Sequence, residues 1–202
     1  MGGFILITTL RYGNTNTFLI RGTKRFILID TDFAGTLPAF YKALGKTGIK
    51  VSDIAYVICT HYHPDHCGLV SQLAEQGITP VVMESQTEHV HYPDEIFSRQ
   101  LQLNYKPILV EGTKTITFKD SRAFLGELGI AGEIIPTPSH SEDSISVILD
   151  DGTVIAGDLE PLEYLAGYAD NAALKADWDS IMSLGPNKIL YAHANAKEFT
   201  QS

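Results

Sequence analysis

The chain has 202 residues, of which 44% are hydrophobic and 19% are charged, a balance typical of a globular domain and not of a disordered chain. Its formal net charge of −9 argues against binding to a nucleic-acid backbone, which requires clustered Lys and Arg. No run of about 18 apolar residues, the length needed to cross a bilayer, occurs in the sequence. We therefore predict one domain over residues 1–202 that acts on a small molecule, with no nucleic-acid or membrane partner.

The first thirty residues alternate short apolar runs with turns, which is typical of an antiparallel meander. The predicted strands are Phe4–Leu10, Thr17–Arg21 and Arg25–Ile29. The first of them has no basic segment before it and no small-residue cleavage site after it, so we interpret it as a strand and not as a signal peptide. Apolar residues at helical spacing then predict a helix from Phe33 to Leu44.

Two acidic residues, Asp30 and Asp32, lie between the third strand and this helix. Asp32 or Thr31 is a candidate helix cap. Asp30 has two interpretations of equal weight. It is a turn or cap residue, or it is a carboxylate that holds a metal-ligating imidazole by its second N–H group.

A dense cluster of candidate metal ligands follows the apolar run Ile54–Cys59. Within six residues the chain carries three histidines and a carboxylate, namely His61, His63, Asp65 and His66. Alternate residues of an extended segment share a face, so His61 and His63 can converge on one ion. Pro64 favours a change of direction after His63, which leaves Asp65 and His66 for a second ion.

The middle of the chain continues with a predicted helix over 65–76 that ends at Gly77, and a strand over 80–83. The stretch 85–103 is predicted to be partly helical and to form an exposed loop or a lid. It contains His89 and His91, which we do not expect to bind metal, because no partner follows at matching spacing. One or two strands are predicted over 107–118.

The second half of the chain repeats the order of strands, a polar turn and a helix. Predicted strands cover Gly132–Pro136, Ser144–Leu149 and Thr153–Ala156, and the Asp151-Gly152 step between the last two is typical of a hairpin. A helix over 171–184 and a strand over 188–191 follow. The two cysteines lie in and beside the first ligand-bearing strand, which indicates reduced thiols and a cytoplasmic location.

Three further candidate ligands each follow an apolar run: His140, Asp158 and His193. Strands that end at one rim bring distant residues together. We therefore predict that these three residues join the histidine cluster in one site.

The combination of these motifs resembles the metallo-β-lactamase superfamily. The matching elements are His-X-His-X-Asp-His at 61–66, Thr-Pro-X-His at 137–140, Gly157-Asp158, His193 and the early Asp30-Thr31. The resemblance implies an α/β fold, a four-layer αββα sandwich with the metal site at one edge of the two sheets. It also implies that His61, His63 and His140 hold one metal, that Asp65, His66 and His193 hold the second, and that Asp158 bridges the two. Asp32 and Ser139 stand where the superfamily usually has Gly.

Nitrogen and oxygen ligands without a thiolate favour two divalent ions, with Zn²⁺ the first choice and Fe or Mn the alternatives. A hydroxide shared by two ions would attack a carbonyl or phosphoryl centre. Asp65 and Asp158 are the predicted catalytic carboxylates: Asp65 orients the hydroxide and passes its proton on, and Asp158 sets the spacing of the ions. Tyr164 or Tyr168 donates to the developing oxyanion, or else lines the pocket or packs in the core.

An aspartate in the bridging position is similar to the glyoxalase II, lactonase and nuclease branches. Nuclease members usually carry added elements that hold RNA or DNA, for which an acidic chain of 202 residues has little room. The predicted function is therefore hydrolysis of a small ester, thioester or lactone by a monomer or a homodimer. The alternatives are an iron-dependent oxidoreductase of the same fold, similar to persulfide dioxygenases, or a β-lactam or phosphodiester hydrolase. A metal-binding protein with little turnover also stays open.

Overall fold

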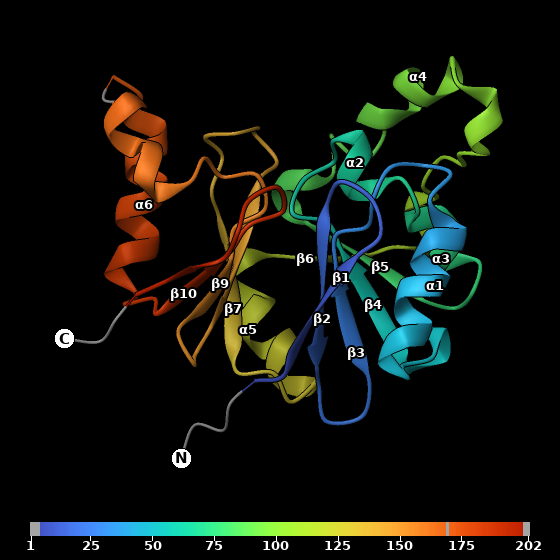
Figure 1. Ribbon diagram of the computed structural model, residues 1–202, viewed down its shortest axis with the longest axis horizontal. Coiled ribbons are helices and arrows are strands. Elements are labelled where there is room, and N and C mark those ends of the chain that lie inside the picture. Colours follow the sequence, from blue (N-terminus) through green and yellow to red (C-terminus); the bar gives the residue numbers. More distant parts are fainter. Residues whose placement is uncertain (1–4, 169, 200–202) are drawn as a thin grey trace.

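Two β-sheets face each other, and helices cover their outer sides (Figure 1). This computed structural model describes residues 5–168 and 170–199. The first sheet has the order β1 (Ile7–Arg11), β2 (Asn16–Arg21), β3 (Phe26–Ile29), β4 (Ile54–Ile58), β5 (Thr79–Met83), β6 (Lys114–Ile116). The second sheet has the order β11 (Lys197–Glu198), β10 (Lys188–Leu190), β9 (Thr153–Ile155), β8 (Ile145–Leu149), β7 (Gly132–Pro136).

Strand direction determines where the loops of the two sheets meet. In the first sheet β1 to β3 pair antiparallel and β3 to β6 pair parallel. In the second sheet β7, β8 and β9 alternate in direction, and β9 pairs parallel with β10. The strands β7, β9 and β10 therefore run the same way, and residues that follow them lie at one edge of the sheet.

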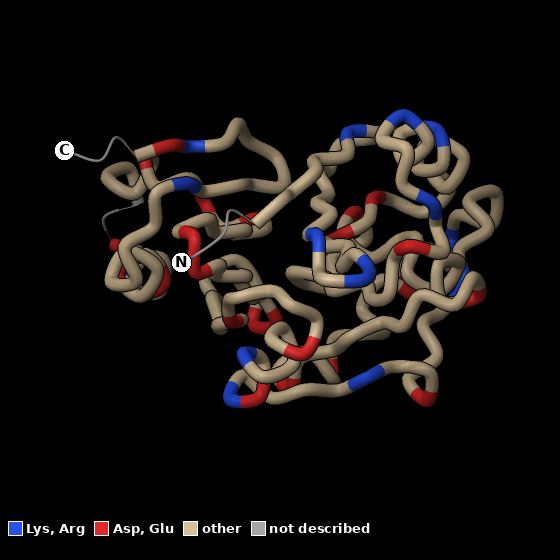
Figure 2. The backbone as a smooth tube through the Cα atoms, turned by 90° about the horizontal axis from the view of Figure 1, so that it is seen from below, with Lys and Arg blue, Asp and Glu red and all other residues tan. Residues whose placement is uncertain are grey.

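The helices are α1 (Leu37–Thr47), α2 (Pro64–Cys67), α3 (Val70–Ala74), α4 (Tyr92–Ser98), α5 (Phe118–Glu127) and α6 (Ala172–Ser183). Short 3₁₀ turns are η1 (Val51–Asp53), η2 (Glu84–Gln86), η3 (Leu101–Leu103), η4 (Val110–Gly112) and η5 (Leu162–Tyr168). No helix in the described part of the chain is long and apolar enough to cross a membrane. Along the chain, acidic and basic positions are interspersed (Figure 2).

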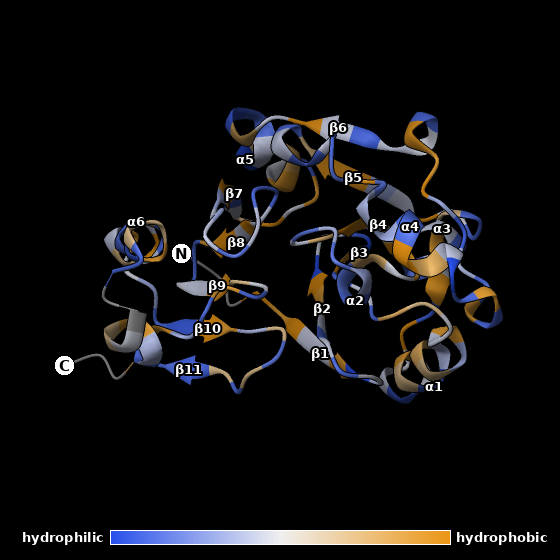
Figure 3. Ribbon diagram, turned by 90° about the horizontal axis from the view of Figure 1, so that it is seen from above, coloured by the Kyte–Doolittle hydropathy of each residue, from blue (hydrophilic) through white to orange (hydrophobic). Residues whose placement is uncertain are grey.

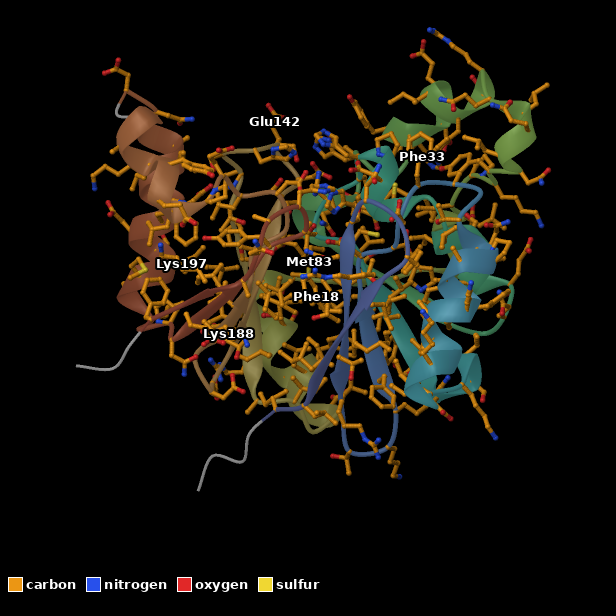
Figure 4. All side chains as sticks on the ribbon, in the orientation of Figure 1. Phe18, Phe33, Met83, Glu142, Lys188 and Lys197 are labelled. Carbon is orange, nitrogen blue, oxygen red and sulfur yellow. The ribbon has the colours of Figure 1, made fainter. Side chains whose placement is uncertain are left out.

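The main core lies between the sheets. Phe18 of β2 and Met83 of β5, both buried, occupy this space in Figure 4. Alternate residues of β2 and β3 point to opposite faces, so Phe18 and Ile27 enter this core while Leu19 and Leu28 pack on the other side. Viewed from above, β2 and β5 carry hydrophobic residues, whereas β11 at the end of the second sheet is hydrophilic (Figure 3).

Helices form the two outer layers. Phe40 and Leu44 of α1 and Leu73 of α3 cover the first sheet. Trp178 and Ile181 of α6 cover the second. The predicted αββα arrangement is confirmed, as is the hairpin between β8 and β9, where Gly152 has φ +87°. Both cysteines are free and buried.

The predicted helix over 33–44 was wrong at its start, because α1 begins only at Leu37. The side chain of Asp32 accepts hydrogen bonds from the amides of Thr15 and Phe33, at 3.2 and 2.6 Å. Gly35 then adopts φ +88°, a conformation that a helix does not allow. The segment before α1 is therefore folded around the carboxylate of Asp32.

The predicted helix over 65–76 is broken into α2 and α3. At the break, the backbone of Gly68 packs directly on the preceding loop. A Cβ atom on Gly68 would lie 2.3 Å from the amide nitrogen of Ala34 and 2.6 Å from the carbonyl oxygen of Asp32.

The strand prediction over 107–118 was correct only for Lys114–Ile116. Residues Val110–Gly112 form a 3₁₀ turn instead. Sequence reasoning also missed α5, whose first turn is capped by Thr117: its hydroxyl accepts from the amide of Asp120 at 3.2 Å. A Thr three residues before an Asp was the available signal.

Candidate metal centre

The structure brings all seven predicted ligands together at one edge of the two sheets. The first four follow β4, in the turn that leads into α2 and within α2 itself. The others come from the second sheet, one after each of three strands that run in the same direction: His140 after β7, Asp158 after β9 and His193 after β10.

One group of potential ligands consists of His61, His63 and His140, whose ligand atoms all lie within 4.8 Å of one another. The Nε2 atom of His140 is 3.1 Å from Nδ1 of His63. The Nε2 atom of His61 is buried and has no hydrogen-bond partner in the described structure. An unpaired buried nitrogen is costly unless a ligand satisfies it.

A second group consists of Asp65, His66 and His193. Their contacts are 3.1 Å from His193 Nε2 to Asp65 Oδ2 and 3.3 Å from His193 Nε2 to His66 Nε2. The Nδ1–H group of His193 donates to the carbonyl oxygen of Asn14 at 3.1 Å, which leaves Nε2 facing the group.

Asp158 lies between the two groups and offers one oxygen to each. Its Oδ1 is 3.3 Å from Nε2 of both His66 and His193. Its Oδ2 is 3.7 Å from Nε2 of His140 and 3.9 Å from Nε2 of His61.

Asp30 is completely buried directly behind the second group. Its Oδ2 lies 3.1 Å from Nδ1 of His66, and its two oxygens accept from the amide and the hydroxyl of Thr60 at 2.6 and 2.9 Å. Of its two interpretations, this geometry supports the carboxylate that orients an imidazole. Asp30 is too far from Leu37, where α1 begins, to cap that helix.

Asp143 is a buried residue of the site that sequence reasoning missed. Its Oδ2 accepts from the amide of Tyr62, between His61 and His63, at 2.7 Å. The hydroxyl of Ser141 donates to its Oδ1 at 2.8 Å. Asp143 thereby joins the loop that carries His140 to the turn that carries two other histidines. Asp143 lies three residues after His140 in the sequence, but this spacing indicates a residue of the site only once the loop is known to be buried.

Burial, and after it repulsion between neighbouring imidazoles, favours the neutral form of His61 and His63. Burial lowers the pKa of His61 well below its ordinary value, and repulsion from His66 and His63 adds to this. Burial also lowers the pKa of His63, with His140 as the next cause. A neutral imidazole is the form that binds metal.

The carboxylates are ionised. A hydrogen bond from His193 lowers the pKa of Asp65 to about 2. Burial opposes ionisation of Asp158, but the hydrogen bond with His66 and the charges of His66, His193 and His140 together outweigh it and lower the pKa of Asp158. Burial also disfavours the charged form of His66 and so lowers its pKa. The carboxylates of Asp30 and Asp158 outweigh burial and raise the pKa of His66 to about 10. In the protein without metal, a proton on His66 thus balances buried negative charge.

These observations fit divalent metal ions. The groups offer imidazole nitrogens and carboxylate oxygens, a donor set used by Zn²⁺, Fe and Mn. The buried Nε2 of His61, which has no hydrogen-bond partner in the described structure, points the same way. Described residues are therefore able to hold metal at two adjoining positions.

The other candidates lie at the rim. Tyr164 is exposed and lines a cavity of about 380 Å³ that also touches His140, Asp158 and His193. The side chain of Tyr168 lies outside the described part of the structure. His91 pairs with Asp94 at 2.9 Å, and neither it nor His89 joins a metal group of the described residues.

Comparison with known proteins identifies the family. The sequence profile of the "Metallo-beta-lactamase superfamily" matches residues 10–193. The chain belongs to the metallo-β-lactamase superfamily. Membership accounts for the αββα layers and for residues able to hold metal at the edge of the sheets, and it makes the chain a member of a superfamily of metal-dependent hydrolases.

Two relatives in the superfamily that bear the names of hydrolases differ in their identity to this chain and in the share of their length that it covers. "Probable metallo-hydrolase MJ0888" of Methanocaldococcus jannaschii is 33% identical over 149 residues, which are 73% of this chain and 68% of the relative. "Hydroxyacylglutathione hydrolase" of Nitrobacter winogradskyi is 24% identical over 143 residues, which are 71% of this chain and 47% of the relative. The matched region thus spans about half to two thirds of the relatives' own length.

Solved structures of the superfamily share the fold. The BLEG-1 B3 metallo-β-lactamase superposes with a TM-score of 0.70 at 18% identity, over 96% of this chain and 94% of that one. At this identity, the similarity concerns the fold alone.

Proposed function

We propose that this chain hydrolyses a small ester, thioester or lactone with the help of two divalent metal ions. The observation that carries the two-metal proposal is the position of Asp158, with Oδ1 3.3 Å from two histidines of one group and Oδ2 3.7 Å from a histidine of the other. A carboxylate between two sets of ligands suits a bridging role. The proposed unit is the whole chain, residues 1–202, as one domain.

Each ion would have three ligands of its own. Those of the first are His61, His63 and His140, and those of the second are Asp65, His66 and His193. Zn²⁺ is the favoured ion because zinc is commonly bound by three or four nitrogen and oxygen donors of this kind. Fe or Mn would use the same donors at higher coordination numbers.

Bound divalent ions supply Lewis acidity and make water a nucleophile at neutral pH. The protein's own contribution begins with Asp65, a carboxylate whose pKa is lowered by the hydrogen bond from His193 when no metal is bound. Its side chain is 35% exposed, so it can orient a water molecule and accept a proton from it. The same carboxylate can then pass that proton to the leaving group.

Tyr164 is the proposed hydrogen-bond donor to the substrate's developing negative charge. It is exposed, stands on η5 and lines the cavity that touches His140, Asp158 and His193. Tyr168 lies on the same turn and is a second candidate.

Acyl chemistry is favoured by two observations. The bridging position holds an aspartate, and a relative in the superfamily bears the name of a hydrolase acting on hydroxyacylglutathione. A nucleic-acid substrate would require clustered Lys and Arg. The net charge of −9 argues against such a substrate.

Metal analysis of the protein purified without added metal tests the metal content. We expect two zinc ions per chain. The metal-loaded protein is then screened on thioesters, lactones, neutral esters, β-lactams and phosphodiesters, with turnover expected on the acyl substrates. One iron per chain with oxygen uptake on glutathione persulfide would contradict hydrolysis, and two metals without turnover would indicate a binding protein.

Replacement of His61 and His63 by Ala tests the ligands themselves. The double variant should lose at least one metal ion per chain and essentially all hydrolytic activity, because it removes two of three ligands of one ion. His91→Ala is the matched control, since that ring is exposed and, among the residues that the structure describes, pairs only with Asp94. A double variant that retains two metals would overturn the assignment.

A further inference from the structure

A polar cavity of about 560 Å³ adjoins the candidate metal centre. Four residues, Pro161, Tyr164, His193 and Ala194, line both this cavity and the smaller one at the metal centre. Its remaining walls come from Glu163 of η5, from the ends of β1 and β2 with the turn between them, and from the loop between β10 and β11 with the start of β11. This turn and this loop lie side by side in Figures 1 and 3.

The walls of this cavity are tied to the metal centre by hydrogen bonds. The amide of Asn16 donates to the carbonyl oxygen of Ala192 at 2.8 Å, and the side-chain amide of Asn16 donates to the carbonyl oxygens of Tyr191 and Ala194 at 3.0 and 3.3 Å. The imidazole of His193 bonds to the carbonyl oxygen of Asn14. The cavity therefore keeps a constant position relative to the proposed ligand His193.

Arg11 brings an uncompensated positive charge to this cavity. It is the last residue of β1 and is exposed. Within residues 5–168 and 170–199, no carboxylate oxygen lies within 4.0 Å of its guanidinium group. The other cation in the wall, Lys197 (Figure 4), is paired with Glu163 at 3.0 Å, so these two charges cancel.

Asn14 and Asn195 add exposed side-chain amides to the same wall. A guanidinium with neutral amide donors suits an anion of forked shape, because Arg can donate two parallel hydrogen bonds to a carboxylate or a phosphate. In a chain with a net charge of −9, such a position also stands out electrostatically.

We propose that this cavity binds an anionic end of the substrate, a carboxylate or a phosphate, through Arg11. The scissile acyl group then lies past His193 and Tyr164, at the metal centre. The inference rests on the proposed hydrolytic function and narrows its substrate class to acyl compounds that carry a negative charge away from the reacting carbonyl.

The test compares 4-nitrophenyl esters of one acyl chain that end in a carboxylate, a phosphate or a neutral carboxamide. With the metal-loaded wild type, we expect a higher kcat/KM for one or both anionic esters than for the carboxamide. Arg11→Gln should lower that ratio roughly tenfold or more, the loss expected for a charge-assisted hydrogen bond. Arg11→Lys should restore part of it, because the charge returns without the fork.

Lys24→Gln is the control, since it removes the same charge from the exposed turn between β2 and β3, which does not line the cavity. Equal turnover of charged and neutral esters by the wild type would overturn the proposal. A uniform loss on all esters in Arg11→Gln would do the same, because it indicates a structural role.

A direct binding measurement separates this proposal from the proposed function. Glutarate and inorganic phosphate are titrated into metal-loaded wild type and Arg11→Gln by calorimetry. Weaker binding to the variant supports the anion site even if no ester is hydrolysed. Identical binding of these anions to both proteins refutes the anion site even if esters are hydrolysed.

Discussion

Asp30 combines an unusual backbone conformation with a direct contact to the proposed ligand His66. It is fully buried, and its φ of 59° is one that side chains other than Asn and Asp rarely adopt. Both of its oxygens are engaged, with Thr60 and with His66. A second N–H that bonds to a carboxylate orients an imidazole and increases its basicity, so Asp30 should act on the metal through His66.

We expect Asp30→Asn to weaken metal binding by roughly 10–100-fold, the range found for partners of metal-ligating histidines. The fold should survive, because Asn tolerates the same positive φ. Competition with a chelating dye measures the affinity, and Asp179→Asn, at an exposed pair on α6, is the control. An unchanged affinity would remove Asp30 from the site.

Asp143 stabilises the two loops that carry the first group of histidines. In Asp143→Ala the amide of Tyr62 would stay buried without its acceptor, at a cost of about 1–3 kcal/mol in the free energy of unfolding. Urea unfolding measures that loss, and Asp179→Ala should cost far less. Because His61 and His63 flank Tyr62, the metal content should fall as well. A variant with lowered stability and two tightly bound metals would limit Asp143 to a role in folding.

At the scale of elements, the break between α2 and α3 determines where Asp65 and His66 lie. At this break Gly68 packs against the backbone of the loop before α1. The carbonyl oxygen of His66 also accepts from the amide and the hydroxyl of Thr31, at 2.9 and 3.1 Å. The loop at Thr31 and the helix α2 thus form one packed unit behind the site.

Gly68→Ala should lower the free energy of unfolding by about 1–3 kcal/mol, since the added methyl group overlaps backbone atoms that must move. Gly45→Ala provides a control with the same chemical change. It lies in α1 with nothing within 4 Å of the added atom, and should raise stability by about 0.5–1 kcal/mol. Denaturant midpoints distinguish the two, and equal effects would refute the packing explanation.

At the scale of the molecule, the candidate metal centre joins the two sheets. Four of its seven side chains follow β4 of the first sheet, and three follow strands of the second. A bound ion with ligands from both sheets stabilises only the folded chain, in which these ligands are assembled.

Removal of metal should therefore lower the melting temperature. At a free metal concentration of 100 to 1,000 times Kd, the stabilisation is about 2.7–4.1 kcal/mol. For a domain of this size that corresponds to roughly 5–16 °C. Calorimetry with and without chelator measures the shift, and zinc should restore it in wild type but not in the His61 and His63 double variant. A chelator that leaves the melting temperature unchanged would argue against ligands shared by both sheets.

The sequence by itself predicted the candidate ligands and, through the motifs that resemble the superfamily, the layers of the fold. Apolar runs predicted most strands, and all seven candidate ligand positions could be recognised as polar residues that follow such a run. These features are local, because strand periodicity and ligand spacing are properties of neighbouring residues.

Tertiary structure alone decided which side chains support the ligands and what surrounds them. Asp30 meets Thr60 and His66 across 30 and 36 positions of the chain, and Asp143 meets Tyr62 across 81. The same is true of the break at Gly68 and of the cavity at Arg11, whose walls come from both ends of the chain. Contacts between distant segments depend on how the sheets pack, which no local pattern specifies.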